Sequence, residues 1–318
     1  MRAGTTAPGT GLDGSGCRAL ARRIRRHVVR MTHRAGSAHV ATSLSMADLL
    51  AVLYGATLHV QPEEPGWPDR DRFILSKGHG CAGLYAVLAE RGFFPITWLD
   101  DFYQNGSRLA GHVTHLGVPG VEASTGALGH GLSIACGMAL SAKRDRRPWR
   151  VFALLSDGEC DEGAVWEAAL FAPHHRLDNL VALVDYNKIQ SLGAVKDVLD
   201  LEPLATKWEA FGWATKEIDG HDVDGIAVAL AAVPFRPGRP SCIVAHTVKG
   251  KGVSFMENNP AFHGKAPSKE QLAQALRELD FSGAQVAEAM QHMGFAAEKI
   301  ADVVNALNKL ATAKTGSG

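Results

Sequence analysis

The sequence of 318 residues predicts an α/β protein with a doubly wound, mainly parallel sheet that has helices on both faces. Short apolar runs that end in turn residues alternate with amphipathic segments along most of the chain, a pattern typical of repeated strand–helix–strand units. The stretch 151–187 contains one such unit in full. A chain of this length buries roughly three quarters of its unfolded surface, which suffices for one large domain or two smaller ones.

The unit at 151–187 is the clearest part of the pattern. An apolar run at 151–155 ends in a turn that contains Asp157 and Gly158, a helical segment follows, and a second apolar run ends at Asn187. The two strands of such a unit are parallel, so we expect Asp157 and Asn187 at the same carboxyl edge of the sheet. Open α/β folds bind their ligands at that edge.

The beginning of the chain is low in apolar residues. Residues 1–16 are rich in Gly, Thr and Ala, so we expect a disordered tail. Positions 17–34 carry apolar residues at helical spacing and arginines on the opposite face, which predicts a basic amphipathic helix. A transit peptide is the alternative interpretation, but the helix runs directly into a motif loop without a separable cleavage region.

The next segment predicts a loop at 35–40 and a helix from about Met46 to Tyr54. Ser45 and Asp48 have the spacing of a capping box, so we expect them to cap this helix.

The remaining elements continue the alternation. In chain order we predict a strand before Gly78, helices ending at Arg91 and spanning 132–143 and 204–211, a strand at 213–218, a helix at 223–233 and a strand at 241–248. A long loop at 249–267 follows, and then Ser268 and Gln271 offer a capping box. The predicted division is therefore a tail at 1–16, one α/β domain at 17–270 and a C-terminal helical extension at 271–318.

Composition excludes several classes of function. The sequence has 33 basic and 33 acidic residues, so its charge does not favour nucleic acid or an anionic membrane surface. No apolar run approaches the ~20 residues of a transmembrane helix. Five scattered cysteines form no C-x-x-C pair, which predicts a reducing compartment, by default the cytoplasm, and argues against a zinc site.

The polar groups at the predicted sheet edge suit a metal ion that carries a phosphate. Asp157 supplies a carboxylate, Asn187 an amide oxygen, and Gly158 a turn whose backbone N–H groups can contact an anion. Mg²⁺ prefers a few protein oxygens, with phosphate and water completing the octahedron.

These residues belong to a longer pattern. In order it comprises Asp157-Gly158, Glu162-Gly163, Glu167 and Asn187. The pattern resembles the thiamine diphosphate fingerprint of the transketolase family, G-D-G…E-G…E…N, with Ser156 in place of the first Gly. The resemblance implies thiamine diphosphate and Mg²⁺ (or Ca²⁺ or Mn²⁺) as cofactors, with Asp157, Asn187 and the main-chain carbonyl of Ile189 as metal ligands.

Further motifs resemble the same family in the same order. They are S-A-H-V-A-T at 37–42, R-D-R-F-I-L-S-K-G-H at 70–79, Gly111-His112, P-G-V-E-A-S-T-G-A-L-G-H-G at 119–131, and K-G-K-G…H-G at 249–264. By this resemblance His39, His79, His112 and His263 would line the substrate channel as hydrogen-bonding and acid/base groups.

The resemblance also assigns cofactor contacts. His79 and His263 would reach the cofactor, Gly126 and Leu128 would contact its aminopyrimidine ring, and Gly158 would lie at its diphosphate. Glu162 would belong to a catalytic carboxylate network that crosses a subunit interface, with Glu167 supporting the cofactor site.

This sequence departs from the family pattern near two of the histidines. Ala38, Val40, Ala41 and Thr42 replace the family's Gly, Pro, Gly and Gly beside His39. We expect a stiffer and bulkier loop there, and therefore a pocket beside His39 that accepts a different substrate. His130 replaces a Gln and is either an extra proton carrier or a polar residue at a helix start, and His115 has no family counterpart.

The resemblance covers residues 18 to about 270, which is half of such an enzyme. Family members bind the cofactor between this domain and a pyrimidine-binding domain, and we find no sequence for the latter. We therefore expect an N-terminal subunit that works with a separately encoded C-terminal subunit, in an αβ or α₂β₂ assembly, to transfer a two-carbon ketol unit from a sugar or sugar phosphate to an aldehyde.

Other interpretations stay open at this point. One is an α subunit of a ketoacid decarboxylase or dehydrogenase, and another is a deoxyxylulose-phosphate-synthase-like protein. A non-catalytic scaffold homologue and a metal-dependent hydrolase are further alternatives, although no dense metal-ligand motif supports the last.

Overall fold

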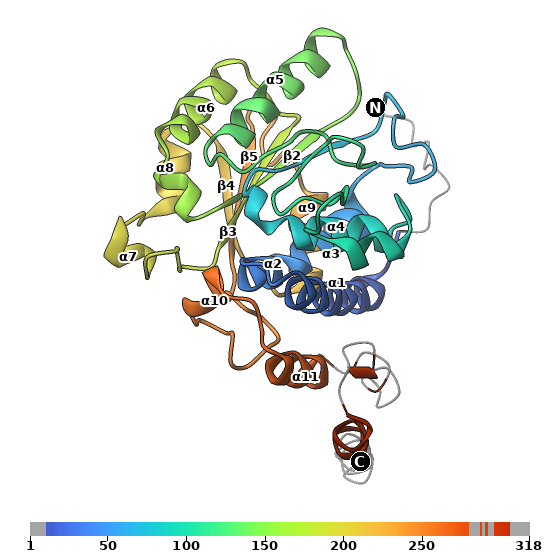
Figure 1. Ribbon diagram of the computed structural model, residues 1–318. Helices are drawn as coiled ribbons and strands as arrows, with labels where there is room; N and C mark the ends of the chain where they lie inside the picture. Colours follow the sequence, from blue (N-terminus) through green and yellow to red (C-terminus); the bar gives the residue numbers. More distant parts are fainter. Residues whose placement is uncertain (1–10, 280–286, 288–289, 292–295, 306–318) are drawn as a thin grey trace, which may run out of the picture.

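The computed structural model describes residues 11–279, 287, 290–291 and 296–305. Within them five parallel strands form one sheet in the order β1-β2-β3-β5-β4 (Figure 1). The strands are β1 (Arg72–Leu75), β2 (Val151–Ser156), β3 (Leu180–Tyr186), β4 (Ala214–Asp219) and β5 (Ser241–His246). The predicted parallel α/β sheet is confirmed.

Helices cover both faces of the sheet (Figure 1). On one face lie α5 (His130–Arg144), α6 (Gly163–His174) and α8 (Leu204–Ala210); on the other lie α1 (Gly14–Ala35), α2 (Val40–Ser45), α3 (Ala47–Val52), α4 (Cys81–Glu90), α9 (Val223–Ala231) and α11 (Lys269–Glu278). Short turns complete the set: the π-helical Leu53–Thr57, the 3₁₀ segments Gly78–Gly80, Ile96–Asp101 and Gly158–Asp161, and α7 (Val195–Val198) and α10 (Ala261–Gly264). The doubly wound arrangement is confirmed.

The central strands are buried on both faces. Every residue of β2 and β3 is buried, and alternate side chains enter different cores. Phe152 and Leu154 join the core beneath α1 to α4, whereas Ala153 and Leu155 join the core beneath α5 and α6. This is why these runs are continuously apolar, as expected for parallel strands covered by helices on both sides.

The first helix is longer at its start than predicted. It begins at Gly14 because the carboxylate of Asp13 accepts a hydrogen bond from the backbone N–H of Gly16 at 2.7 Å, so residues 14–16 are helix and not tail. Residues 1–10 of the predicted tail lie outside the described part. Gly36, with φ of 60°, ends the helix. Among the described helices, none combines the length and the apolar composition needed to cross a bilayer.

The predicted loop at 35–40 and the single helix from Met46 are corrected by the structure. Helix begins at Val40, directly after His39, which has φ of 69°. This helix ends at Ser45, Met46 is not helical, and a new helix, α3, begins at Ala47.

The predicted capping box of Ser45 and Asp48 is wrong. The hydroxyl of Ser45 donates to the buried carboxylate of Asp185 at 2.6 Å, and Asp48 forms a buried ion pair with Arg25 at 2.5 Å. Both side chains therefore bond to residues distant in the sequence and do not cap the helix.

The C-terminal elements lie close to their predicted positions. The capping box of Ser268 and Gln271 is present at the start of α11. The expected boundary at residue 270 lies inside this helix, whose Leu272 and Leu276 are buried in the core. Residues 297–305 are helical, and the rest of the expected extension beyond 279 lies largely outside the described residues.

The chain topology identifies the ligand edge of the sheet. After β3 the chain continues to α8 on one face, whereas after β5 it continues to α11 on the other. A crevice opens at the carboxyl ends of neighbouring strands whose connections leave in opposite directions. In this sheet that position lies between β3 and β5.

Candidate active site

Four histidines from four separate segments meet beside this edge. His39 precedes α2, His79 follows β1, His112 lies in the loop between α4 and α5, and His263 lies in α10. The ring centroid of His39 lies 5.1 Å from that of His79, 5.8 Å from that of His112 and 5.0 Å from that of His263. The structure thus brings together the histidines that the sequence singled out, with His39 at the centre.

The position of His39 is fixed by its backbone. Its N–H donates to the carbonyl of His263 at 2.8 Å, and its positive φ turns the chain sharply into α2. The replaced residues Val40, Ala41 and Thr42 belong to that helix and are buried. Their added bulk therefore fills the core and does not stiffen a loop, contrary to the expectation from the sequence. Among the described residues, nothing hydrogen-bonds the buried Nδ1 of His39.

Three of these imidazoles, those of His39, His79 and His263, are neutral at neutral pH. Burial, together with the charges of nearby His112, Lys249 and Lys77, lowers the pKa of His39 to about 4. Burial and the charge of Lys249 lower the pKa of His263 to about 4, and burial and Lys77 lower the pKa of His79 well below its usual range. The rings can therefore accept or donate hydrogen bonds without carrying charge.

Asp157 and Asn187 lie at the same edge, as the strand–helix–strand pattern predicts. The carboxylate of Asp157 accepts from the backbone N–H groups of Gly158 at 2.8 Å and Lys188 at 2.5 Å. Burial and the nearby charge of Asp185 raise the pKa of Asp157 to about 6. A buried carboxylate with a raised pKa favours a cation beside it.

Asp157, Gly158, Asn187 and Ile189 form one corner of the site, called the diphosphate corner below. Lys249 connects this corner to the histidines. It follows β5, is 1% exposed, and its Nζ donates to the carbonyl of Ile189 at 2.7 Å and to Nδ1 of His263 at 2.9 Å. Burial and the charge of Lys77 lower its pKa to about 8. Since an ammonium only donates, Nδ1 of His263 must accept, which leaves the proton of that ring on Nε2.

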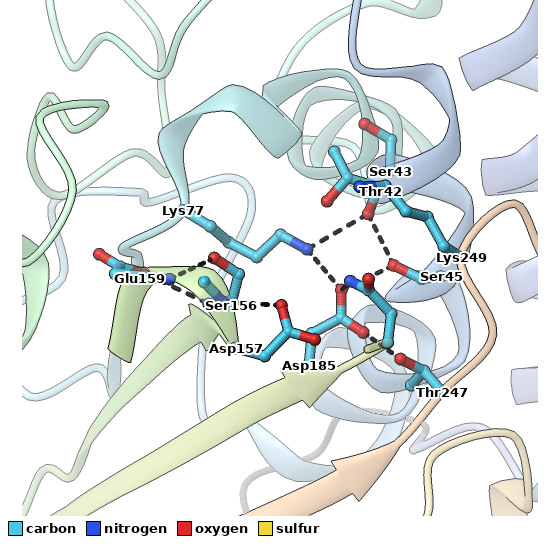
Figure 2. A network of polar contacts seen from close by, with 12 residues as sticks. Thr42, Ser43, Ser45, Lys77, Ser156, Asp157, Glu159, Asp185, Thr247 and Lys249 are labelled. Atoms are coloured by element: carbon cyan, nitrogen blue, oxygen red, sulfur yellow. Dashed lines mark hydrogen bonds and ion pairs between the residues drawn. The ribbon is translucent and has the colours of Figure 1, made fainter. Parts of the chain in front are cut away.

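Lys77 and Asp185 form a buried ion pair at the same edge of the sheet (Figure 2). Both side chains are fully buried and paired with each other, and Lys77 also donates to the carbonyl of Thr42 at 3.4 Å. Sequence reasoning missed Lys77, Asp185 and Lys249 as site residues. The available signal was their position within three residues of the end of an apolar strand, where a charged side chain can face the crevice.

Glu159 fixes the glycine-rich loop to the strand ends. Its buried carboxylate accepts from the hydroxyl of Ser76 at 2.5 Å, from the N–H of Gly129 at 3.0 Å and from the N–H of Ser156 at 3.3 Å. Figure 2 shows Glu159 beside Ser156. The hydroxyl of Ser156 accepts in turn from the N–H of Glu159 at 3.3 Å. Ser156 therefore contributes to the turn in which the family pattern has Gly.

The glycine-rich loop packs directly on the histidine cluster. Gly126 has φ of 144°, and a Cβ at that position would lie 2.8 Å from the ring of His112. Leu128 is half-buried beside it. His130 is the exposed first residue of α5, and His115 is exposed with its Nδ1 2.8 Å from the hydroxyl of Ser124. Neither of these histidines has a ring contact with the cluster in the described structure.

Glu162 and Glu167 lie on the surface. Both are exposed, Glu162 directly before α6 and Glu167 within it, and Glu162 lies next to Gly129 of the glycine-rich loop. Within the described residues, the structure does not bring either carboxylate into hydrogen-bonding contact with the histidines. On the same helix Leu170 is 61% and Phe171 is 38% exposed.

Side chains alone do not form a metal cage here. Among the described residues no group of three or more His, Cys, Asp and Glu side chains is arranged to hold a metal ion. Asp157, the amide oxygen of Asn187 and the carbonyl of Ile189 offer one carboxylate and two neutral oxygens, a set that suits Mg²⁺ only when phosphate and water complete the shell.

Comparison with known proteins agrees with this geometry. The family model described as transketolase, thiamine diphosphate binding domain, matches residues 17–309. The 6-deoxy-6-sulfo-D-fructose transketolase subunit of a Clostridium species is 44% identical over 261 residues, covering 82% of this chain and 95% of the relative. An apulose-4-phosphate transketolase subunit of Phocaeicola vulgatus is 39% identical over 255 residues, covering 80% and 90%.

Longer relatives match over part of their length. The bovine transketolase-like protein 2 is 40% identical over 261 residues, which is 41% of its chain. The solved structure of transketolase from Campylobacter jejuni superposes with a TM-score of 0.80 at 29% identity, covering 95% of this chain and 48% of the other. This chain therefore spans about half the length of that structure.

Proposed function

This chain belongs to the transketolase family, and we propose that it is the N-terminal subunit of a two-component transketolase-like enzyme. Relatives named as transketolase subunits are covered almost completely by this chain, whereas the longer transketolases are covered by less than half. The proposed reaction transfers a two-carbon ketol unit from a ketose or sugar phosphate to an aldehyde. Bound thiamine diphosphate would supply the carbon nucleophile for that transfer.

The single observation that carries the proposal is the bridge made by Lys249. Its ammonium joins the carbonyl of Ile189, in the corner of Asp157 and Asn187, to His263 in the histidine cluster. The proposed diphosphate site and the proposed proton-transfer site would then lie a single side chain apart. Such an arrangement suits a cofactor whose diphosphate is anchored in the corner and whose reacting part lies at the histidines.

Lys249 is a suitable partner for the diphosphate. Its two hydrogen-bond acceptors, a carbonyl and an imidazole, are neutral, and no carboxylate of the described residues forms an ion pair with it. The carboxylates of Asp157 and Asp185 act on this ammonium only from beyond ion-pair distance. A buried ammonium without a directly paired anion is costly, so an anion is expected beside it. Lys77 differs because Asp185 already compensates its charge.

The metal would be held by the corner itself. Asp157 would contribute the full negative charge, and Asn187 and the Ile189 carbonyl two neutral oxygens, with the N–H groups of the Gly158 turn contacting phosphate. The raised pKa of the buried Asp157 supports this assignment, since a cation would stabilise its ionised form.

The histidines would orient the sugar and move its protons. Nε2 of His263 carries that ring's proton and would donate it as a hydrogen bond to a substrate oxygen. His39 has a buried Nδ1 without a described partner, which supports a ligand contact at this ring. His79 and His112 would complete the channel.

The surface of α6 supports the proposal of a partner subunit. Glu167 shares this helix with the exposed Leu170 and Phe171, and Glu162 lies directly before it. A protein interface would cover such a combination of carboxylates and apolar side chains. We assign this face to the pyrimidine-binding domain of the separately encoded subunit, in an α₂β₂ assembly. Glu162 would then enter the carboxylate network that crosses the interface.

The substrate class separates this proposal from its closest alternative. The mixture of this chain and its partner subunit is assayed with ketoses that carry a phosphate or sulfo group, and separately with pyruvate. We expect a sugar product extended by two carbons when an aldehyde acceptor is added. Release of CO₂ from pyruvate, without ketol transfer from any ketose, would instead assign the chain to a ketoacid decarboxylase or dehydrogenase.

A further inference from the structure

Asp185 and Lys77 lie where the pattern of the sheet calls for apolar side chains. Asp185 continues the β3 face on which Val181 and Leu183 enter the core, and both charged side chains are fully buried. Replacing a buried ion pair with apolar residues often leaves a protein as stable or makes it more stable. Fold stability alone therefore does not explain this pair.

The carboxylate of Asp185 gathers four segments around one point. It accepts from the ammonium of Lys77 after β1, from the hydroxyl of Ser45 in α2 at 2.6 Å, from the hydroxyl of Thr247 after β5, and from Nδ2 of Asn187 at 3.4 Å. Figure 2 shows Lys77, Ser45 and Thr247 converging on Asp185. These are the segments that carry the diphosphate corner and the histidines.

The first consequence concerns the amide of Asn187. An ionised carboxylate only accepts hydrogen bonds, so Asn187 must turn its NH₂ group toward Asp185. Its Oδ1 then faces away from Asp185 and accepts from the N–H of Ile189 at 3.2 Å. Asp185 and the N–H of Ile189 therefore together determine the orientation of this amide, with its oxygen away from Asp185.

The second consequence concerns α2, which begins directly after His39. With six residues and no side-chain cap, this helix is too short to be stable by itself. It is held from outside by Ser45 on Asp185, by Lys77 on the carbonyl of Thr42, and by the N–H of Gly250 on the carbonyl of Ala41 at 2.9 Å. Two of these three contacts end at the buried ion pair.

We propose that Lys77 and Asp185 are positioning residues that lock the amide of Asn187 and the helix behind His39 into one rigid unit. They touch neither the proposed metal nor the substrate. They act through Asn187 and α2, so that the diphosphate corner and the central histidine keep a fixed separation before any ligand arrives. The part that concerns metal binding rests on the proposed function; the part that concerns α2 does not.

Hydrogen exchange of the full chain without cofactor tests the α2 part. Ser45→Ala and Thr247→Val each remove one hydroxyl from the same carboxylate, but only the first removes a contact of α2. We expect the backbone amides of residues 40–45 to exchange on the order of tenfold faster in Ser45→Ala and at the wild-type rate in Thr247→Val. Unchanged exchange in Ser45→Ala, or equal acceleration in both variants and in α5 as well, would overturn the proposal.

Binding of Mn²⁺ with inorganic pyrophosphate tests the Asn187 part. Asp185→Asn keeps the shape of the side chain but can donate, so the amide of Asn187 loses one of the two contacts that orient it. We expect Mn²⁺ affinity to fall by about 10- to 100-fold in Asp185→Asn, as is typical for partners of metal ligands, and by less than about threefold in Thr247→Val. Wild-type affinity in a folded Asp185→Asn would overturn it.

The two measurements separate this proposal from the proposed function. If the wild-type chain binds neither Mn²⁺ nor pyrophosphate, the metal assignment fails, and hydrogen exchange still decides whether the pair positions α2. If Asp185→Asn does not fold, Ser45→Ala still decides the α2 part, because it disconnects α2 while leaving the ion pair intact.

Discussion

Replacing Lys249 with Met removes the charge that joins the diphosphate corner to the histidine cluster. The Met side chain has a similar length and is apolar, so the packing around this buried position is largely kept. Lys251→Met is the matched control, because that lysine lies in the same loop but its side chain is 39% exposed and 3.9 Å from Glu257. We expect Lys249→Met to weaken binding of the cofactor and Lys251→Met to leave it nearly unchanged.

The magnitude follows from the surroundings of Lys249. A hydrogen bond to a charged group contributes about 1.5 to 3 kcal/mol, and each 1.4 kcal/mol corresponds to a tenfold change in affinity. The ammonium is buried and its hydrogen-bond partners are neutral, so its contact with a diphosphate would not be diluted by solvent or by a directly paired carboxylate. Affinity for thiamine diphosphate should therefore fall by roughly 10- to 100-fold.

Calorimetric titration of thiamine diphosphate with Mg²⁺ into the assembled enzyme measures this effect. A second readout is the pKa of His263, followed by NMR in the cofactor-free chain. The charge of Lys249 is one cause of its low value, so the pKa should rise in Lys249→Met and stay near 4 in Lys251→Met. Binding within about threefold of wild type in Lys249→Met would refute the assignment of this lysine to the diphosphate.

Three further changes test other parts of the site. Asp157→Ala should abolish Mg²⁺-dependent cofactor binding, since it removes the only full charge among the proposed protein ligands, and Asn187→Ala should weaken binding less; calorimetry of both variants checks the order. His263→Ala should lower turnover by about 10²- to 10⁴-fold with an unchanged far-UV circular dichroism spectrum, whereas turnover within about threefold would make it a loop residue only. The pKa values of His39 and His263, about 4 in the folded chain against an ordinary 6.5, lie below their unfolded values, so the stability that they contribute is present above pH 6.5 and is lost as pH falls toward 4. Over that interval the melting temperature of the wild type should therefore fall further than that of a His39→Gln, His263→Gln double variant.

The sequence predicted the scaffold and the histidines because both depend on local pattern. Continuous apolar runs identified the buried strands at 151–155 and 180–184, and the parallel direction of such units placed Asp157 and Asn187 together. The histidines were found because each follows a strand or lies in a recognisable motif. Their convergence to within 6 Å of His39 is a consequence of the topology.

The sequence did not predict the buried charges. Lys77 and Asp185 are separated by 108 positions and Ser45 and Asp185 by 140, so no local window contains both partners. A charged residue beside an apolar run is ordinarily read as exposed, and burial becomes favourable only when a distant partner compensates it. The failed capping box of Ser45 has the same origin, since its hydroxyl bonds to Asp185 and not to its own helix.

Two helix starts were also predicted wrongly, here because of a single local residue and not a distant partner. The start of α1 was placed too late because Asp13, a strong N-cap, lies in a segment whose composition is otherwise typical of a tail. The start of α2 was missed because an unusual positive φ at His39 is needed before the helix begins. Both depend on a single residue's conformation, which periodicity does not report.

The most direct test of the central claim is ketol transfer measured with only this chain, with only the separately encoded C-terminal subunit, and with the two mixed. Each reaction contains thiamine diphosphate, Mg²⁺, a ketose that carries a phosphate or sulfo group, and an aldehyde acceptor. The account predicts product in the mixture only, because this chain supplies the diphosphate corner and the histidines, and the partner supplies the pyrimidine-binding domain. Full turnover by this chain alone would contradict the proposed division of the active site between two subunits.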